Sequence, residues 1–133
     1  MAKFNIINKA EKVVDYVLTI TEKSPKKLRC DLVPELRKLA FRIMNDIVRA
    51  NFIVLNEKTN ATDVDKRLEY QTDCQVTIRV LEATCEICNK HSYVTNHQLE
   101  TLSKQTQELF DMVSKWITSD TQRCAVVRLG VPQ

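Results

Sequence analysis

The chain has 133 residues, a net charge of +3, 44% hydrophobic and 28% charged residues, and a single glycine, Gly130. This length and balance predict one compact domain and exclude a wholly disordered chain. The lack of glycine before Gly130 excludes most β architectures and glycine-rich phosphate loops, because their tight turns depend on that residue.

The first predicted helix covers about residues 5–23 and ends where Ser24 precedes Pro25. Apolar residues recur every three or four positions along it, which is the period of one helical face: Ile6, Ala10, Val13, Val17 and Ile20. The second predicted helix covers 32–55, with Asp31 as its N-cap and Pro34 in its first turn. Its expected core stripe is Leu32, Leu36, Leu39, Ile43, Ile47, Ala50 and Val54.

The third predicted helix covers 63–89, with Thr62 and Asp65 as a variant of the capping box. Its expected core stripe is Val64, Leu68, Gln71, Cys74, Ile78, Leu81, Cys85 and Cys88. A second apolar line follows Val76, Val80, Ala83 and Ile87, so this helix is either central or part of an oligomer contact.

The fourth predicted helix covers 96–118, and Thr95 with Gln98 forms a capping box at its start. Its core stripe includes Leu102, Leu109, Val113 and Trp116. Periodicity stops after 118, and residues 121–133 are expected to be a flexible C-terminal tail. Long helices and short loops predict an all-α fold, an up-down-up-down antiparallel four-helix bundle that spans residues 1–120 as a single domain.

Two cysteines and two histidines, Cys85, Cys88, His91 and His97, invite comparison with a zinc site. The favoured interpretation is two packed thiols and two exposed histidines, with no metal and no cofactor. The cysteines have no evident base partner, and no nucleotide-binding fingerprint is present, so we expect no enzymatic activity.

Basic residues form the more informative pattern. On the second helix Lys38, Arg42, Asn45 and Arg49 recur along one outer line opposite the core stripe, with Phe52 next along it, and Arg37 is a further candidate on the same helix. Other cations belong to the first helix and the connector after it: Lys12, Lys23, Lys26, Lys27 and Arg29. Cations at helical spacing can follow a phosphate backbone, so these residues are candidate nucleic-acid contacts. A merely solvated helix exterior is the alternative.

Residues 20–51, with the connector Thr21-Glu-Lys-Ser-Pro-Lys and the later Trp116-Ile117, resemble a group of small four-helix-bundle proteins. Two branches compete: the accessory variability determinant (Avd) of diversity-generating retroelements, and proteins encoded in intervening sequences of ribosomal RNA genes. The second branch has proline and glycine where this chain reads Phe41 to Asn51 without either, which favours the Avd branch.

The resemblance implies a non-enzymatic accessory subunit that binds the retroelement reverse transcriptase and its template RNA, or an RNA/DNA hybrid, and supports mutagenic cDNA synthesis. It also implies a homo-oligomer, a pentamer in this family. The alternative is a structural, oligomer-forming bundle of the ribosomal-RNA type with a protein or RNA partner. No secretory signal or membrane-spanning run is evident, so we expect a cytoplasmic protein.

Overall fold

The computed structural model describes residues 2–24, 31–56 and 58–129, with side chains from residue 5 to residue 123 of these ranges. The described residues form four α-helices and no strand, as the sequence predicts. They are α1 (Ala2–Thr21), α3 (Leu32–Phe52), α4 (Ala61–Lys90) and α5 (Asn96–Leu129).

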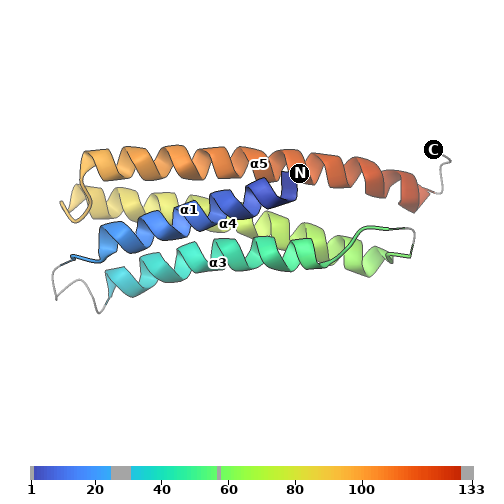
Figure 1. Ribbon diagram of the computed structural model, residues 1–133, viewed down its shortest axis with the longest axis horizontal. Coiled ribbons are helices and arrows are strands. Elements are labelled where there is room, and N and C mark those ends of the chain that lie inside the picture. The colour runs from blue at the N-terminus through green and yellow to red at the C-terminus, as the bar shows by residue number, and fades with distance from the viewer. Residues whose placement is uncertain (1, 25–30, 57, 130–133) are drawn as a thin grey trace.

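Each helix packs against two others. α1 lies against α3 and α5, and α4 lies against the same two helices, so α1 and α4 are diagonal to each other. The chain direction alternates from helix to helix, which is the predicted up-down-up-down arrangement (Figure 1). α1 begins and α3 ends at about the same level along the bundle, alongside the second half of α5, and only the first turns of α4 and the last turns of α5 continue past that level (Figure 1).

The core comes from the inward apolar line of each helix. Its fully buried members include Val13, Ile43, Ile78, Leu109 and Val113. Burying a side chain of this size contributes roughly 1.5–3 kcal/mol, so this contiguous set is the main source of stability. The helical periodicity of the sequence therefore located most of the core correctly.

Two predicted core positions are wrong. Val54 is exposed, because α3 ends at Phe52 and the chain turns away there. Leu68 is also exposed, and the neighbouring Arg67 takes the inward position with a relative exposure of 1%.

A polar network explains how Arg67 is accommodated in the core. Its guanidinium binds Asp120 of α5 through two hydrogen bonds, from Nε to Oδ2 at 2.7 Å and from Nη2 to Oδ1 at 3.1 Å. Nη1 donates to the carbonyl oxygen of Ile53, just beyond the end of α3, at 2.6 Å. Gln71 Nε2 also donates to Asp120 Oδ2 at 2.7 Å, and the guanidinium lies 5.2 Å from the ring centre of Trp116. A buried charge is tolerated only when it is paired and hydrogen-bonded in this way.

The same network corrects the predicted end of the last helix. α5 continues to Leu129, well past the predicted end at 118 and through most of the segment expected to be a flexible tail. Asp120 lies after the predicted helix end at 118 and directly before the expected tail, and it is buried against α4, which fixes the chain where the apolar period has stopped. Residues 130–133 lie outside the described part of the chain.

The helix caps were predicted in part. The capping box of α5 is confirmed: Gln98 N donates to Thr95 Oγ1 at 3.1 Å, and Thr95 N donates to Gln98 Oε1 at 3.0 Å. α4 begins two residues earlier than predicted, and its N-cap is Asn60 rather than Thr62, with Asp63 N donating to Asn60 Oδ1. Asp31 occupies the N-cap position of α3 but accepts no capping hydrogen bond there.

α4 ends in a Schellman motif built without glycine. Tyr93 N donates to the Cys88 carbonyl at 2.8 Å, and Ser92 N donates to the Asn89 carbonyl at 3.0 Å. Ser92 occupies the left-handed position with a φ of 64°. Glycine is usual at this position because a Cβ there crowds the backbone.

We expect Ser92→Gly to raise the free energy of unfolding by about 0.5–1 kcal/mol, since relief of the left-handed strain exceeds the extra entropy of the unfolded chain. Urea denaturation followed by circular dichroism measures the change. Ser92→Ala keeps the Cβ and is expected to give no gain. An unchanged Ser92→Gly variant would show that the turn is unstrained.

We expect Asp120→Ala to lower the free energy of unfolding by about 3–5 kcal/mol, because it leaves the Arg67 charge buried without a partner. The matched control is Asp111→Ala, which removes an exposed carboxylate from the same helix and should change stability by about 0.5 kcal/mol or less. The double variant R67M/D120L should lose less than Asp120→Ala alone. Equal losses at Asp111 and Asp120 would contradict this account of the network.

Candidate nucleic-acid interface

Three of the predicted cations form a continuous line on α3. Lys38, Arg42 and Arg49 are separated by four and seven residues and are all exposed, and we call them the α3 basic row. Among the residues with described side chains, none of the three forms an ion pair. Their charged groups therefore remain exposed to an anion outside the chain, although Arg42 and Arg49 also interact with Asp46.

The α3 basic row lies on the side of α3 that faces α4. The guanidinium of Arg49 lies 6.0 Å from the ring centre of Tyr70, a residue of α4. Arg42 and Arg49 also act electrostatically on Asp46, the buried acid between them. These contacts hold part of the row against the bundle while its charged groups remain exposed.

Asp46 is a buried acidic group next to Arg42 and Arg49 of the α3 basic row. Its relative exposure is 8%, and its Oδ2 atom accepts no hydrogen bond from any described residue. Burial raises the pKa of Asp46, and the nearby Asp73 carboxylate raises it further, while Arg42 and Arg49 oppose the shift. The row therefore lies above a carboxyl group whose charged form is disfavoured by its surroundings.

The remaining predicted contacts do not join this row. Lys12 lies near Glu108 of α5. Lys9, also on α1, forms an ion pair with Glu108. Because α1 and α4 are diagonal, the α1–α5 side is opposite the α3–α4 side. Lys23 is exposed just after α1.

Arg37 faces the other way from the row. It is only partly exposed, and its Nε donates to Thr21 Oγ1 at 2.9 Å, which joins α3 to the end of α1. The connector residues Lys26, Lys27 and Arg29 lie outside the described part of the chain. The structure thus gathers Lys38, Arg42 and Arg49 and separates them from Lys12 and Arg37.

Large apolar side chains are exposed next to the α3 basic row. Phe41, Val48 and Phe52 recur at seven and four residues along α3, and Phe52 has a relative exposure of 86%. The sequence pattern pointed to Phe52 but missed Phe41, because single apolar residues on a polar helix face are common and carry no signal of their own. The sequence signal that could have identified Phe41 is its spacing: it follows Lys38 by three residues, just as Phe52 follows Arg49 by three residues.

α4 carries a second exposed apolar surface. Its members follow one helical line and are Val76, Val80, Ala83 and Ile87, which we call the α4 apolar strip. Within the single chain this line faces away from the core rather than into it. Of the two predicted roles for the line, a central position in the bundle is therefore wrong.

The four residues compared with a zinc site are not gathered. Cys85 and Cys88 are buried in the core, whereas His91 and His97 are exposed, and His91 stacks on Tyr93 with ring centres 5.9 Å apart. Burial raises the pKa of Cys85 to about 12, with further increases from Cys88 and Glu82, so this thiol stays protonated at neutral pH. In the described part of the chain, no cluster of three or more His, Cys, Asp or Glu side chains could hold a metal ion.

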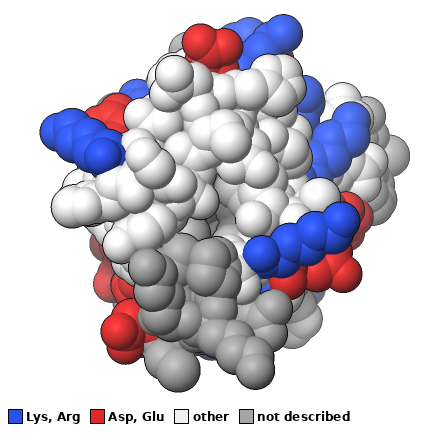
Figure 2. Space-filling model, turned by 90° about the vertical axis from the view of Figure 1, so that its left-hand side faces the viewer, with Lys and Arg blue, Asp and Glu red and all other residues white. Residues whose placement is uncertain are grey.

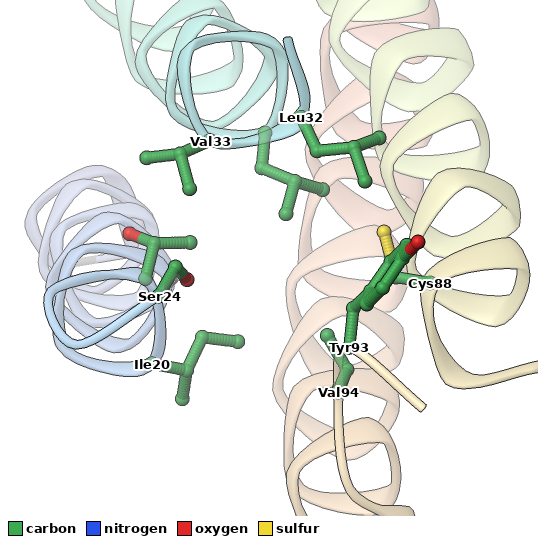
Figure 3. Close-up of a pocket in the computed structure, with 9 residues that line it drawn as sticks. Ile20, Ser24, Leu32, Val33, Cys88, Tyr93 and Val94 are labelled. Atoms are coloured by element: carbon green, nitrogen blue, oxygen red, sulfur yellow. The ribbon is translucent and has the colours of Figure 1, made fainter. Parts of the chain in front are cut away.

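Neither described hollow resembles a catalytic cleft. One is a cavity of about 10 Å³ between the end of α1, the start of α3 and the α4–α5 turn, where Tyr93 lies beside Cys88 and faces Leu32 and Ile20 (Figure 3). That volume is at the lower limit for one water molecule. The other is an open hollow of about 570 Å³ whose charged lining residues are Glu22 and Arg37.

The end of the bundle that contains the α4–α5 turn is largely uncharged at its centre, and charged side chains lie around its rim (Figure 2). The candidate cationic surface is therefore on a side of the bundle rather than at this end. None of the helices in the described residues has the length and apolar content needed to cross a bilayer.

Comparison with known proteins adds no identification: no protein-family model matches the chain, and no curated protein is significantly similar to it.

The buried position of Asp46 predicts a pH dependence. Because the pKa of Asp46 is raised on folding, its contribution to stability is complete below the ordinary value of 3.8 and is lost as pH rises through the raised pKa. Asp46→Asn should therefore raise the free energy of unfolding at neutral pH, and its advantage should shrink as pH falls toward 3.8.

Urea denaturation between neutral and acidic pH measures this effect. Asp15→Asn, an exposed position on α1, provides the control for loss of one negative charge. A stability gain of the same size for Asp15→Asn would attribute the effect to net charge rather than to burial.

Proposed function

We propose that this protein is a non-enzymatic accessory subunit that binds nucleic acid through the α3 basic row. The single observation that carries the proposal is that Lys38, Arg42 and Arg49 are exposed in one line, with no ion pair to another described side chain. Cations arranged in this way bind phosphates without reading base sequence.

The resemblance to Avd proteins makes the proposal more specific. The partners would be the reverse transcriptase of a diversity-generating retroelement and its template RNA or an RNA/DNA hybrid, in the cytoplasm. The uninterrupted α3 helix supports this branch, because the segment from Phe41 to Asn51 is helical and lacks the proline and glycine of the ribosomal-RNA branch.

A homo-oligomer, pentameric by family resemblance, is part of the same proposal. The α4 apolar strip supports it, since exposed apolar residues in one line are typical of protein interfaces. The strip and the α3 basic row lie on different helices, so self-association and nucleic-acid binding need not compete for the same residues.

Reversing the charge of the α3 basic row tests the nucleic-acid proposal. We expect the variant K38E/R42E/R49E to lose most RNA affinity at low salt while keeping its helical content, because all three changes are on exposed positions. Fluorescence anisotropy with a labelled RNA, repeated over a range of salt concentrations, measures affinity and its salt dependence.

The control variant K12E/K104E/K115E changes net charge by the same amount at exposed residues of α1 and α5. It should bind RNA more tightly than K38E/R42E/R49E. Salt-independent binding, or equal loss in the two variants, would contradict a specific role for the row.

The second candidate function is a purely structural oligomer whose partner is another protein. The exposed α4 apolar strip favours it, because that surface needs no nucleic acid to be covered. Light scattering with and without RNA separates the two functions: a protein-only assembly keeps one mass in both conditions and shows no salt-dependent RNA binding.

A further inference from the structure

The outer surface of α3 combines cations and aromatic rings in a repeated arrangement. Lys38 precedes Phe41 by three residues, and Arg49 precedes Phe52 by three residues. Residues three apart are neighbours on a helix surface, so each cation has a ring beside it. The two pairs are eleven residues apart, close to three helical turns, and therefore lie on the same side of α3.

Both rings are available to a ligand. Phe52 has a relative exposure of 86% and Phe41 of 40%. Among the described residues, neither ring stacks on another aromatic side chain or lies under a cation. Leaving such large apolar surfaces in water is unfavourable, and a partner that covers them gains that free energy.

The neighbouring charges identify the kind of partner. Lys38, Arg42 and Arg49 flank the rings on the α4 side, and they form no ion pair with described residues. A ligand that satisfies both features must present anionic groups in a line together with flat apolar faces. Nucleic acid with unpaired bases has this chemistry, because phosphates alternate with accessible ring faces.

We propose that α3 binds single-stranded nucleic acid in preference to duplex, with bases stacked on Phe41 and Phe52 and phosphates on Lys38, Arg42 and Arg49. This inference rests on the proposed nucleic-acid function and defines its substrate class. A duplex hides its base faces inside the stack, so it can use the cations and leaves both rings uncovered. The two cation–ring pairs are about 16 Å apart along the helix, which suits a short stretch of a few nucleotides.

Binding of oligouridine and of an RNA duplex with the same number of phosphates per strand, at one salt concentration, tests the preference. The wild-type protein should bind oligouridine more tightly than the duplex. The variant F41A/F52A should weaken oligouridine binding by at least about tenfold and leave duplex binding and the salt dependence unchanged.

Two further variants distinguish stacking from loss of apolar surface. Val48→Ala removes an exposed aliphatic side chain from the same face and should leave oligouridine affinity unchanged. Phe52→Trp preserves a flat ring, so it should retain affinity, and its indole fluorescence should be quenched by oligouridine relative to the buried Trp116 signal.

Three outcomes would overturn the inference. Salt-dependent binding with equal affinity for both RNAs, or equal weakening of both by F41A/F52A, would leave phosphate binding in place and remove base stacking. A change in oligomeric mass in F41A/F52A, with unchanged RNA affinity, would assign the rings to a protein interface. No binding of either RNA by the wild type would refute the proposed function and this inference together.

Discussion

The buried pair of Arg67 and Asp120 is the interaction on which one end of the bundle depends. α1 begins and α3 ends near this level while α4 and α5 continue past it, so the end of α3 has to be joined to α4 and α5 here (Figure 1). Arg67 does this by contacting all three: it starts from α4, pairs with Asp120 of α5 and binds the Ile53 carbonyl beyond α3. An apolar side chain there could fill the space but would leave that carbonyl without a partner.

This closure determines where the exposed features lie. Arg67 fixes the end of α3 against α4. The α3 basic row then lies next to polar residues of α4 along the side that the two helices share. Arg49 of α3 contacts Tyr70 of α4, and the Asp73 carboxylate of α4 raises the pKa of Asp46. The α3 basic row therefore follows the boundary between α3 and α4. The outermost line of α3 remains for Phe41 and Phe52, which no other described helix covers.

Local sequence patterns account for the number of helices, the capping box at Thr95 and most of the core. These features depend on residues within a few positions of one another. Arg67 and the length of α5 were not predictable in this way, because the partner of Arg67 is 53 residues away and neither charge belongs to an apolar period. For the same reason the sequence identifies the cations of α3 but does not show that Arg37 and Lys38 face different sides of the helix. That difference follows from the hydrogen bond that Arg37 donates to Thr21 of α1.

The turn between α4 and α5 has a consequence for the order of assembly. It is closed at one side by the Schellman hydrogen bonds of Ser92 and Tyr93 and at the other by the capping box of Thr95 and Gln98, all within a few residues. Bringing its ends together therefore requires little loop-closure entropy, whereas the α1–α5 ion pair joins residues 99 positions apart. On entropic grounds the α4–α5 hairpin is the part of this fold that can form first, with α1 added to a partly built core.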